Sequence, residues 1–401
     1  MKATHISKTA IVLQNGPTAG GAFTYEGNVL ASLSKLPNHA EFIVLCPPST
    51  TESIQESFPM FTVVPYTCGL VAKFFIAIRG SLSGYYLLKS IGMRYGKFEK
   101  SLRRNGVGLA YFLSPNPISL DLVDTAMIHT VWDLGHRDVP EYPEITGDRH
   151  YEEREYFYSR MLPKSFRVVV DTPHTASRIA DIYKVSLDRI IVGGLSPARK
   201  KVTSSTEINS FVKSLHQFFL YPAQFWPHKR HVLLTEAFSQ FLKSHPSVNL
   251  VFTGSDKGNM SHIKDLVNKL GIQKNVHFLG FVSDELLTEL MENTVSLMFP
   301  CQLGPSNLPP LEAAQLGTRS IISNIHHDPA LDHALIKQLT DQSVSTWVQA
   351  MKTQISSETP QNANIPITNP EIVNLVDEAF AQFWQIRNEW SSSINHPYVR
   401  K

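Results

Sequence analysis

The sequence predicts an α/β protein made of two doubly wound domains, and three observations support this. The chain has 401 residues, which is enough for two ordinary domains. Apolar strand-like segments alternate with helical segments in both halves, which indicates parallel sheets covered on both faces. A polar segment without periodicity, residues 196–210, is expected to be the linker. We therefore expect domains at residues 1–200 and 201–370, followed by a terminal element at 371–401.

The first half begins with a short apolar strand, which runs into the turn-rich loop Asn15–Gly21 and then a helical pattern through Leu36. Two more helices are expected at Asp148–Leu162 and Thr175–Tyr183. The expected strands are Thr9–Leu13, Glu41–Cys46, Phe61–Tyr66, Leu109–Leu113, Met127–Trp132, Val168–Asp171 and Ile190–Val192.

The second half shows the same alternation more clearly. The expected strands are Phe218–Tyr221, Asn249–Thr253, Val276–Val282, Val295–Phe299 and Ser320–Ser323. The expected helices are Val232–Leu242, Ser261–Leu270, one capped by Ser283, one from Pro310 to Gly317, and the amphipathic Glu371–Trp390. The pattern of the last helix also fits packing on its own domain. Ligands of doubly wound sheets bind at the carboxyl ends of the strands.

Composition narrows the class of protein. A net charge of +2 gives no overall attraction to nucleic acid, so we expect no nucleic-acid partner. Cys46, Cys68 and Cys301 have no metal-binding spacing, which favours a reduced, cytoplasmic compartment. The N-terminal segment is expected to be a strand and not a signal peptide, and Lys73 and Arg79 interrupt the most apolar region.

A basic cluster lies where the first strand of the second half meets its helix. His228, Lys229, Arg230 and His231 are expected in the first helical turn, where each exposed cation is unfavourable by ~0.3–1 kcal/mol. A bound anion, most naturally a pyrophosphate, would reverse this penalty. The alternative is a solvated basic turn without a ligand.

A second loop, Pro300–Ala314, is rich in proline and leads into another helix, so its backbone amides could bind phosphate. Glu312 is expected in the first turn of that helix. Its carboxylate could accept hydrogen bonds from both ribose hydroxyls, as an acidic residue does in dinucleotide-binding folds. The alternative is that Glu312 only complements the helix dipole.

These segments together resemble the family 4 retaining glycosyltransferases, which have the GT-B fold, and in particular a branch with a Gly-Pro-Ser/Thr-Asn loop. Three stretches in the second half match in order. They are Ala223–Arg230, Val276–Leu286 and Gly304–Ala314. The first half adds Gly20-Gly21 with Thr24-Tyr25, Thr130–Asp138 and Tyr151–Tyr156.

The resemblance implies two Rossmann-like domains facing a central cleft. The first would bind the acceptor, the second would bind the nucleotide sugar, and the terminal helix would cross back to the first. The implied reaction moves a hexose, with a mannose-like sugar favoured, from a GDP- or UDP-sugar to a saccharide or lipid-linked acceptor with retention. The implied setting is polysaccharide or lipopolysaccharide biosynthesis. No Asp-x-Asp pair occurs in the chain, and we expect no cofactor and no essential metal.

The resemblance also implies roles for individual residues. Lys229 would bind the diphosphate and stabilise the departing charge, and Glu312 would hold the ribose. Phe281 and Val282 would line the base pocket, and Gly20 and Gly21 would allow a close approach to the donor. The remaining donor-binding candidates are Gln224, Arg230, Gly304, Ser306, Asn307 and Leu308.

Three positions depart from the usual family pattern. Gly304 stands where the family usually has a glutamate, Gln224 where it has an arginine, and Trp132 where many members have histidine. His129, as a third catalytic candidate, and His136 are nearby substitutes for the missing contact to the transferred sugar, and a structural role is the alternative for both.

Between Lys73 and Arg104 the chain has eight basic residues and one acid, Glu99, interleaved with apolar side chains. This composition is typical of a membrane-surface contact or an acceptor-phosphate site, and we expect peripheral attachment to the inner face of a membrane. The alternative is a solvated helix with a buried apolar face. Two other functions stay open for the whole chain: a GT-B-shaped sugar-nucleotide epimerase and a catalytically degenerate nucleotide-sugar-binding subunit.

Overall fold

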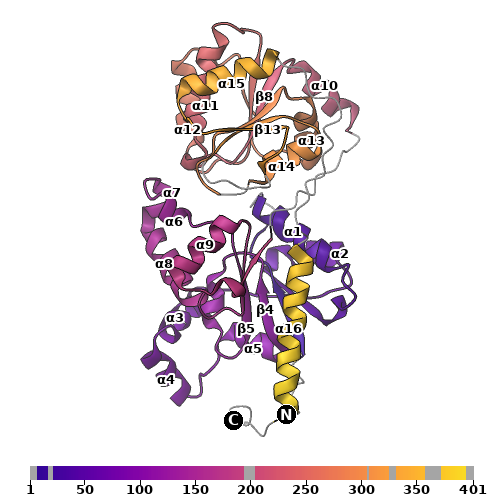
Figure 1. Ribbon diagram of the computed structural model, residues 1–401, viewed down its shortest axis with the longest axis vertical. Coiled ribbons are helices and arrows are strands. Elements are labelled where there is room, and N and C mark those ends of the chain that lie inside the picture. The colour runs from indigo at the N-terminus through magenta and orange to yellow at the C-terminus, as the bar shows by residue number, and fades with distance from the viewer. Residues whose placement is uncertain are drawn as a thin grey trace. The chain divides into compact units, whose positions relative to one another are not determined.

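The computed structural model describes residues 7–16, 21–193, 204–304, 307–324, 331–356 and 372–393. The chain forms two compact units (Figure 1). The first unit comprises Met1–Trp132, Arg154–Gly194 and Pro370–Lys401, and the second comprises Asp133–Glu153 and Leu195–Asn369. Asp133–Glu153 therefore belongs to the second unit, which the expected boundary near residue 200 did not anticipate.

The first unit is built on a parallel sheet of seven strands in the order β3-β2-β1-β4-β5-β6-β7. The order reverses between β1 and β4. The strands are β1 Lys8–Val12, β2 Phe42–Cys46, β3 Thr62–Pro65, β4 Val107–Phe112, β5 Ala126–Val131, β6 Arg167–Val170 and β7 Ile190–Val192. All seven expected strands are present, because each is a run of apolar and β-branched residues that is short enough to cross a sheet once.

The helices of the first unit include four that were not expected from the sequence pattern, namely α2, α3, α4 and α5. The helices are α1 Gly21–Leu33, α2 Thr51–Ser57, α3 Leu70–Arg79, α4 Leu82–Ser90, α5 Lys97–Arg104, α9 Pro173–Tyr183, α16 Ile372–Ser393 and, from Arg154 onward, α8 His150–Met161. The helix expected from Asp148 begins only at His150, since Asp148 and Arg149 have left-handed backbone angles with φ of 51° and 64°.

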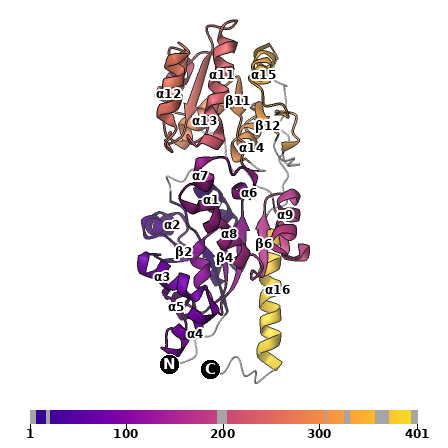
Figure 2. The same ribbon diagram turned by 90° about the vertical axis from the view of Figure 1, so that its left-hand side faces the viewer.

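Helix α16, the last described element of the chain, packs along the first sheet (Figure 2). Its Trp384 Nε1 donates to Thr9 Oγ1 at 3.0 Å, and Asn38 Nδ2 donates to Asp377 Oδ1 at 3.3 Å. The ring of Phe380 meets that of Phe42 with centroids 5.6 Å apart. The apolar stripe of this helix is therefore buried against the first unit and not against the domain that precedes it in sequence.

The second unit contains a parallel sheet of six strands in the order β10-β9-β8-β11-β12-β13. The strands are β8 Phe218–Pro222, β9 Asn249–Thr253, β10 Val276–Phe278, β11 Ser296–Phe299, β12 Ser320–Ser323 and β13 Ile336–Leu339. Its helices are α6 Gly135–Asp138, α7 Pro143–Thr146, α10 Thr206–Ser214, α11 His231–Leu242, α12 Met260–Lys269, α13 Asp284–Asn293, α14 Leu308–Gln315 and α15 Val344–Ser356.

Two expectations for this unit need correction. Residues expected in the linker form part of α10, which starts after Ser205, whose side chain accepts a hydrogen bond from the Ile208 backbone at 3.3 Å. The strand expected to reach Val282 ends at Phe278, because Gly280 has a φ of 68° that breaks the extended backbone. Among the described residues, no helix is long and apolar enough to cross a bilayer.

Candidate functional site

The strand order of the second sheet reverses between β8 and β11, and the carboxyl ends of these two strands carry the two loops singled out from the sequence. In doubly wound sheets such a switch point is where ligands bind, since the adjoining loops diverge to opposite faces. The two loops are in contact here. Gln302 N donates to the His228 carbonyl at 3.0 Å, and Lys229 Nζ lies 3.2 Å from Cys301 Sγ. The structure thus brings the two loops together, although the contacting residues Lys229 and Cys301 are 72 positions apart in the sequence.

The turn that carries Lys229 is built differently from the expected first helical turn. Pro227–Lys229 forms a separate 3-10 turn, Arg230 has left-handed angles with φ 54° and ψ 41°, and α11 begins at His231. Of the four basic residues, only His231 lies in the helix. Tyr221 Oη donates to the Lys229 carbonyl at 2.6 Å and fixes the turn from the end of β8. The prediction that His228, Lys229 and Arg230 lie in the first turn of α11 and oppose its dipole is therefore wrong. His228 and Lys229 lie in the preceding 3-10 turn, and Arg230 is the left-handed residue before the helix.

Lys229 is half-buried and points to the switch point. Besides its contact with Cys301, its ammonium lies 5.1 Å from the centroid of the Phe299 ring at the end of β11. A sulfur atom and an aromatic face are weak partners for a cation. This amine is therefore held in place and still has donors for an anion.

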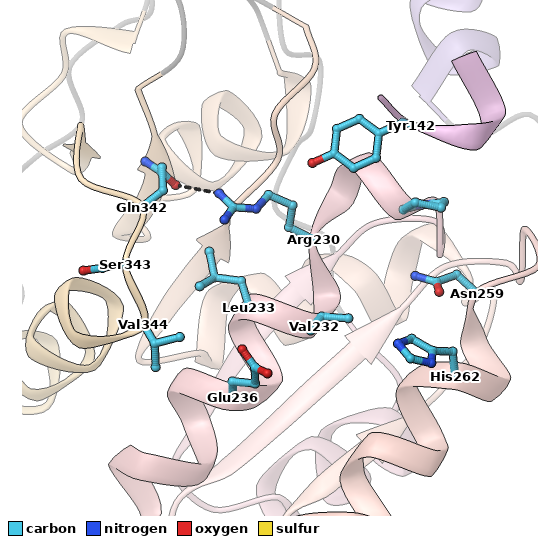
Figure 3. A pocket seen from close by; sticks show the side chains of 11 residues that line it. Tyr142, Arg230, Val232, Leu233, Glu236, Asn259, His262, Gln342, Ser343 and Val344 are labelled. Atoms are coloured by element: carbon cyan, nitrogen blue, oxygen red, sulfur yellow. Dashed lines mark hydrogen bonds between the residues drawn. The ribbon is translucent and has the colours of Figure 1, made fainter. Parts of the chain in front are cut away.

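The neighbouring Arg230 points elsewhere. Its Nη1 donates to Gln342 Oε1 at 3.4 Å, and its side chain lines a separate cavity of about 610 Å³ (Figure 3). The donor-binding role that the resemblance implies for Arg230 has no support in this geometry.

Gln224, which the sequence resemblance aligns with an arginine, has both ends of its amide engaged. Its Oε1 accepts from Trp226 Nε1 at 3.1 Å, and its Nε2 donates to Ser255 Oγ at 3.2 Å. Gly254 makes this close approach of the β8 and β9 loops possible, because it has a φ of 122° and a Cβ there would clash with the Ala223 carbonyl. Gln224 thus joins two loops at the edge of the site.

His228 is buried and bound to Glu144 of the short helix α7. Glu144 Oε1 accepts from the His228 backbone at 2.9 Å and lies 2.8 Å from its Nδ1. Burial, and then the nearby Lys229, hold the pKa of His228 below its ordinary value. Tyr142 also donates to Gln302 Oε1. Sequence reasoning missed Tyr142 and Glu144, since nothing in their spacing links them to residues some 80 to 160 positions later.

The loop after β11 starts its helix earlier than expected. Helix α14 begins at Leu308 with Asn307 at the N-cap position, so Glu312 lies in the second turn and not in the first. A carboxylate complements the helix dipole mainly in the first turn, so this placement does not support the alternative that Glu312 has only that role. Its side chain is buried, with 5% exposure.

Gly304 has a φ of 92°, which strongly disfavours any other residue. A glutamate at this position would be strained in the same backbone conformation. Asn307 Nδ2 donates to the Gly304 carbonyl at 3.1 Å. Ser306 lies outside the described residues.

Phe281 and Val282 follow β10, which is two strands from β8 in the sheet. Phe281 is 65% exposed, an unusual position for a large aromatic side chain, and Val282 is half-buried. Both lie at the carboxyl edge of the sheet, just before Ser283 caps α13. Their predicted contact with a base stays a prediction.

In the first unit, Gly21 is the exposed first residue of α1, and a Cβ there would have no neighbour within 4 Å. Gly20 lies outside the described residues. His129 lies inside β5 with 1% exposure and stacks on Phe112 with ring centroids 4.6 Å apart. Burial lowers the pKa of His129 to about 3. This placement favours the structural alternative for His129 over a catalytic role. His136 is also fully buried, on α6.

The switch point of the first sheet, between β1 and β4, holds a buried carboxylate that the sequence did not reveal. Glu26 of α1 accepts hydrogen bonds from the backbone of Gln14 and Asn15, both at 3.0 Å, and from the Ser114 hydroxyl. Burial raises the pKa of Glu26 above its ordinary value. The carboxylate joins the ends of the two central strands.

Comparison with known proteins agrees with this architecture. Residues 207–330, which include both loops of the switch point, match the family model described as "Glycosyl transferases group 1". No curated protein sequence matches the chain.

Three solved structures illustrate the likeness of fold. Sucrose-phosphate synthase from Thermosynechococcus elongatus is 17% identical with a TM-score of 0.66, covering 96% of this chain and 100% of its own. Anabaena HepE in complex with UDP-glucose is 15% identical with a TM-score of 0.62, covering 96% and 100%. The lipopolysaccharide outer core galactosyltransferase WaaB is 14% identical with a TM-score of 0.60, covering 94% and 100%. The predicted fold class, GT-B with two Rossmann-like domains, is confirmed, whereas the cleft between the domains stays a prediction.

Proposed function

We propose that the chain binds a nucleotide-diphosphate sugar at the β8–β11 switch point and transfers its hexose, with retention, to a saccharide or lipid-linked acceptor. The observation that carries the proposal is the position of Lys229 Nζ, held beside Cys301 at the reversal of strand order, within the segment that matches the glycosyltransferase family. A fixed cation at such a point suits a diphosphate better than a neutral ligand.

The chemistry follows from charge. When the sugar leaves, negative charge develops on the diphosphate, and a preorganised ammonium stabilises that charge more than it stabilises the bound substrate. Lys229 would serve this role. Glu312, buried on the helix after β11, would hold the ribose hydroxyls.

UDP-sugars are the first donors to test, because HepE, a protein of the same fold, binds UDP and UDP-glucose. GDP-mannose belongs in the same panel, because the sequence resemblance favours a mannose-like sugar. The likeness to WaaB supports a role in lipopolysaccharide or polysaccharide assembly as part of the proposal.

The test is a thermal-shift screen with UDP, GDP and ADP and their glucose and mannose derivatives, followed by turnover with a mixed acceptor pool. A ligand that binds only the native state raises the melting temperature by mass action. Stabilisation by one nucleotide diphosphate and release of that nucleotide with an acceptor are expected. Binding without any turnover would instead favour the degenerate binding subunit, and epimerised free sugar nucleotide would favour the epimerase.

We also propose that the reaction needs no metal ion, because lysine and backbone amides would supply the charge stabilisation. Adding a chelator to a working assay tests this. Retained activity is expected, and complete loss that added Mg²⁺ or Mn²⁺ restores would refute it.

A membrane contact is the further part of the proposal, and the ion pairs of segment 73–104 decide which of its residues we include in it. Three of the eight basic residues of segment 73–104 are used internally. Arg79 forms a buried ion pair with Asp121, whereas Arg94 and Arg103 pair with Asp124. The acids come from outside the segment, which the local charge count overlooked. Helix α5 buries Phe98 and Leu102, so the segment is not one continuous amphipathic element.

The exposed apolar side chains instead gather on α3 and α4 and the residue that follows. Six large hydrophobic residues there are 61–85% exposed: Leu70, Phe74, Leu82, Tyr86, Leu87 and Ile91. Exposed Lys73 and Lys89 accompany them. Clustered apolar side chains beside lysines suit an anionic lipid surface.

Sedimentation with neutral and anionic vesicles tests the contact. Stronger binding to anionic vesicles is expected, and the triple variant Phe74→Gln, Leu82→Gln, Leu87→Gln should abolish it. Leu187→Gln is the matched control, since Leu187 is 61% exposed elsewhere on the first unit. Equal partitioning into both vesicle types, or no effect of the triple variant, would refute the contact.

A further inference from the structure

A cavity of the second unit is lined by residues that follow the switch-point strand β8, and its lining includes charged groups of both signs. It has a volume of about 610 Å³, within the range of small-molecule sites. Its walls come from the starts of α11, α12 and α15, so it opens at the carboxyl edge of the sheet. Figure 3 shows Asn259 and His262 on the opposite side of the opening from Gln342 and Ser343.

Arg230 is held in this cavity by a fixed partner. Gln342 Oε1 accepts from the guanidinium at 3.4 Å and also from Ser323 Oγ at 2.6 Å, and Gln342 Nε2 donates to the Leu339 carbonyl at 2.5 Å. An arginine has five N–H donors, and within the described part of the chain only this one hydrogen bond is made by its side chain. The other N–H groups of the guanidinium form no hydrogen bond with any residue that the structure describes.

The backbone of Arg230 is also strained. Its left-handed angles are unfavourable for a residue with a side chain, by roughly 1–2 kcal/mol. Strained residues of this kind gather at binding sites, where the side chain is needed. The left-handed turn directs Arg230 toward Gln342, whereas the side chain of Lys229 reaches Cys301.

Glu236, six residues further along on α11, also lines the cavity, and its carboxylate forms no hydrogen bond or ion pair with any residue that the structure describes. A cation and an anion therefore face the same space without pairing to each other. A phosphate or nucleotide would be attracted by Arg230 but repelled by Glu236. A neutral ligand with many hydroxyl groups satisfies both, since hydroxyls accept from a guanidinium and donate to a carboxylate.

The rest of the lining fits the same kind of ligand. Val232, Leu233 and Val344 give apolar surface, and the Tyr142 ring is fixed by the bond from its hydroxyl to Gln302. Sugar rings have C–H faces that pack on such surfaces and hydroxyl edges that bind planar polar groups. Asn259 and His262 add two planar polar groups.

We propose that this cavity is a second saccharide-binding site, which takes a neutral sugar unit and is separate from the Lys229 site. The proposal does not depend on the proposed transfer reaction, because it concerns binding by other side chains.

The experiment is saturation-transfer NMR on the full chain with glucose, galactose, N-acetylglucosamine, maltose and lactose, with inorganic phosphate and UDP as charged probes. Binding of at least one neutral saccharide is expected. Glu236→Ala and Arg230→Gly should each weaken it about tenfold or more, since each removes charged hydrogen bonds to the ligand. Arg230→Gly also relieves the backbone strain, so loss of folding is not expected from it.

Two controls separate this site from the switch point. Gln240→Ala changes an exposed residue of the same helix and should leave saccharide binding intact. Lys229→Met should weaken UDP but not the saccharide, and Glu236→Ala should do the reverse. The proposal is overturned if no neutral saccharide binds, if Glu236→Ala leaves saccharide binding unchanged, or if UDP competes with the sugar for the cavity.

Discussion

The amine of Lys229 lies 3.2 Å from the sulfur of Cys301, although the two residues are 72 positions apart. They meet because β8 and β11 are neighbours in the sheet at the point where the strand order reverses. The topology of the sheet, more than any local motif, thus places a cation where a doubly wound fold binds its ligand.

Replacing that cation is the first prediction. Lys229→Met keeps the length and apolar part of the side chain and removes the charge. Affinity for the nucleotide diphosphate should fall by about ten- to a hundredfold, the effect of losing one or two charge-assisted hydrogen bonds. Isothermal titration with UDP, or with whichever nucleotide stabilises the chain, measures this.

Cys301→Ser is the matched control for Lys229→Met. A hydroxyl can still accept from the amine, so nucleotide affinity should stay within about twofold of the parent. Equal affinity of Lys229→Met and the parent protein would show that the diphosphate binds elsewhere.

The strands could be predicted from the sequence because each is a short apolar run between turn residues, as in Phe218–Pro222 and Asn249–Thr253. The positions of the loops after β8 and β11 at the carboxyl ends of their strands could be predicted for the same reason, because they follow from the order of elements. Gly304 was singled out in the sequence by the family resemblance, whereas its φ of 92° is visible only in the structure.

Directions of side chains could not be predicted. Lys229 and Arg230 are adjacent in sequence, yet the left-handed angles of Arg230 send their side chains to Cys301 and Gln342 respectively. Glu144 and Tyr142 were missed, because their contacts join parts of the chain that no periodicity connects. For His129 the sequence left a site role and a structural role open, since a histidine inside a strand looks the same in sequence whether it is buried or not.

The second prediction concerns His129 and pH. Burial depresses its pKa from 6.5 to about 3, so below pH 6.5 the unfolded chain takes up a proton that the folded chain does not. This contribution to stability is present above pH 6.5 and is lost as pH falls toward 3, at about 1.4 kcal/mol for each pH unit. His129→Phe should therefore be more stable than the parent, increasingly so at acidic pH.

Chemical denaturation of the two proteins from pH 7.5 down to pH 4.5 measures the difference. His245→Phe is the control, because His245 also stacks on a phenylalanine, with centroids 4.4 Å apart, but is only half-buried. A difference between His129→Phe and the parent that does not grow on acidification would contradict burial of a neutral His129.

The third prediction concerns the docking of α16. Phe380 is 1% exposed and meets the rings of Phe42 and Tyr111, with centroids 5.6 and 6.0 Å away. Phe380→Ala should lower the free energy of unfolding by about 3–5 kcal/mol, since it leaves a cavity between helix and sheet. Glu378→Ala, at an exposed position of the same helix, should change it by less than about 0.5 kcal/mol. Equal effects would show that the helix is not packed on the first sheet.

The fourth prediction concerns Glu26, whose carboxylate joins the ends of β1 and β4. One oxygen accepts from the Gln14 backbone and the Ser114 hydroxyl, and the other accepts from the Asn15 backbone at 3.0 Å. In Glu26→Gln the amide nitrogen must replace one of these acceptors and would face a donor. The free energy of unfolding should fall by about 1–3 kcal/mol, the effect of leaving a buried donor unpaired.

Glu52→Gln, at an exposed position in the first turn of α2, is the matched control and should be neutral within about 0.5 kcal/mol. Amide hydrogen exchange at Gln14 and Asn15 adds a local readout, because one of these two N–H groups loses its acceptor in Glu26→Gln and neither does in Glu52→Gln. Faster exchange there, with unchanged protection in β8, would show that Glu26 holds this loop specifically. Unchanged exchange at both residues would mean that other groups fix the loop, because a backbone donor that loses its only acceptor becomes open to water.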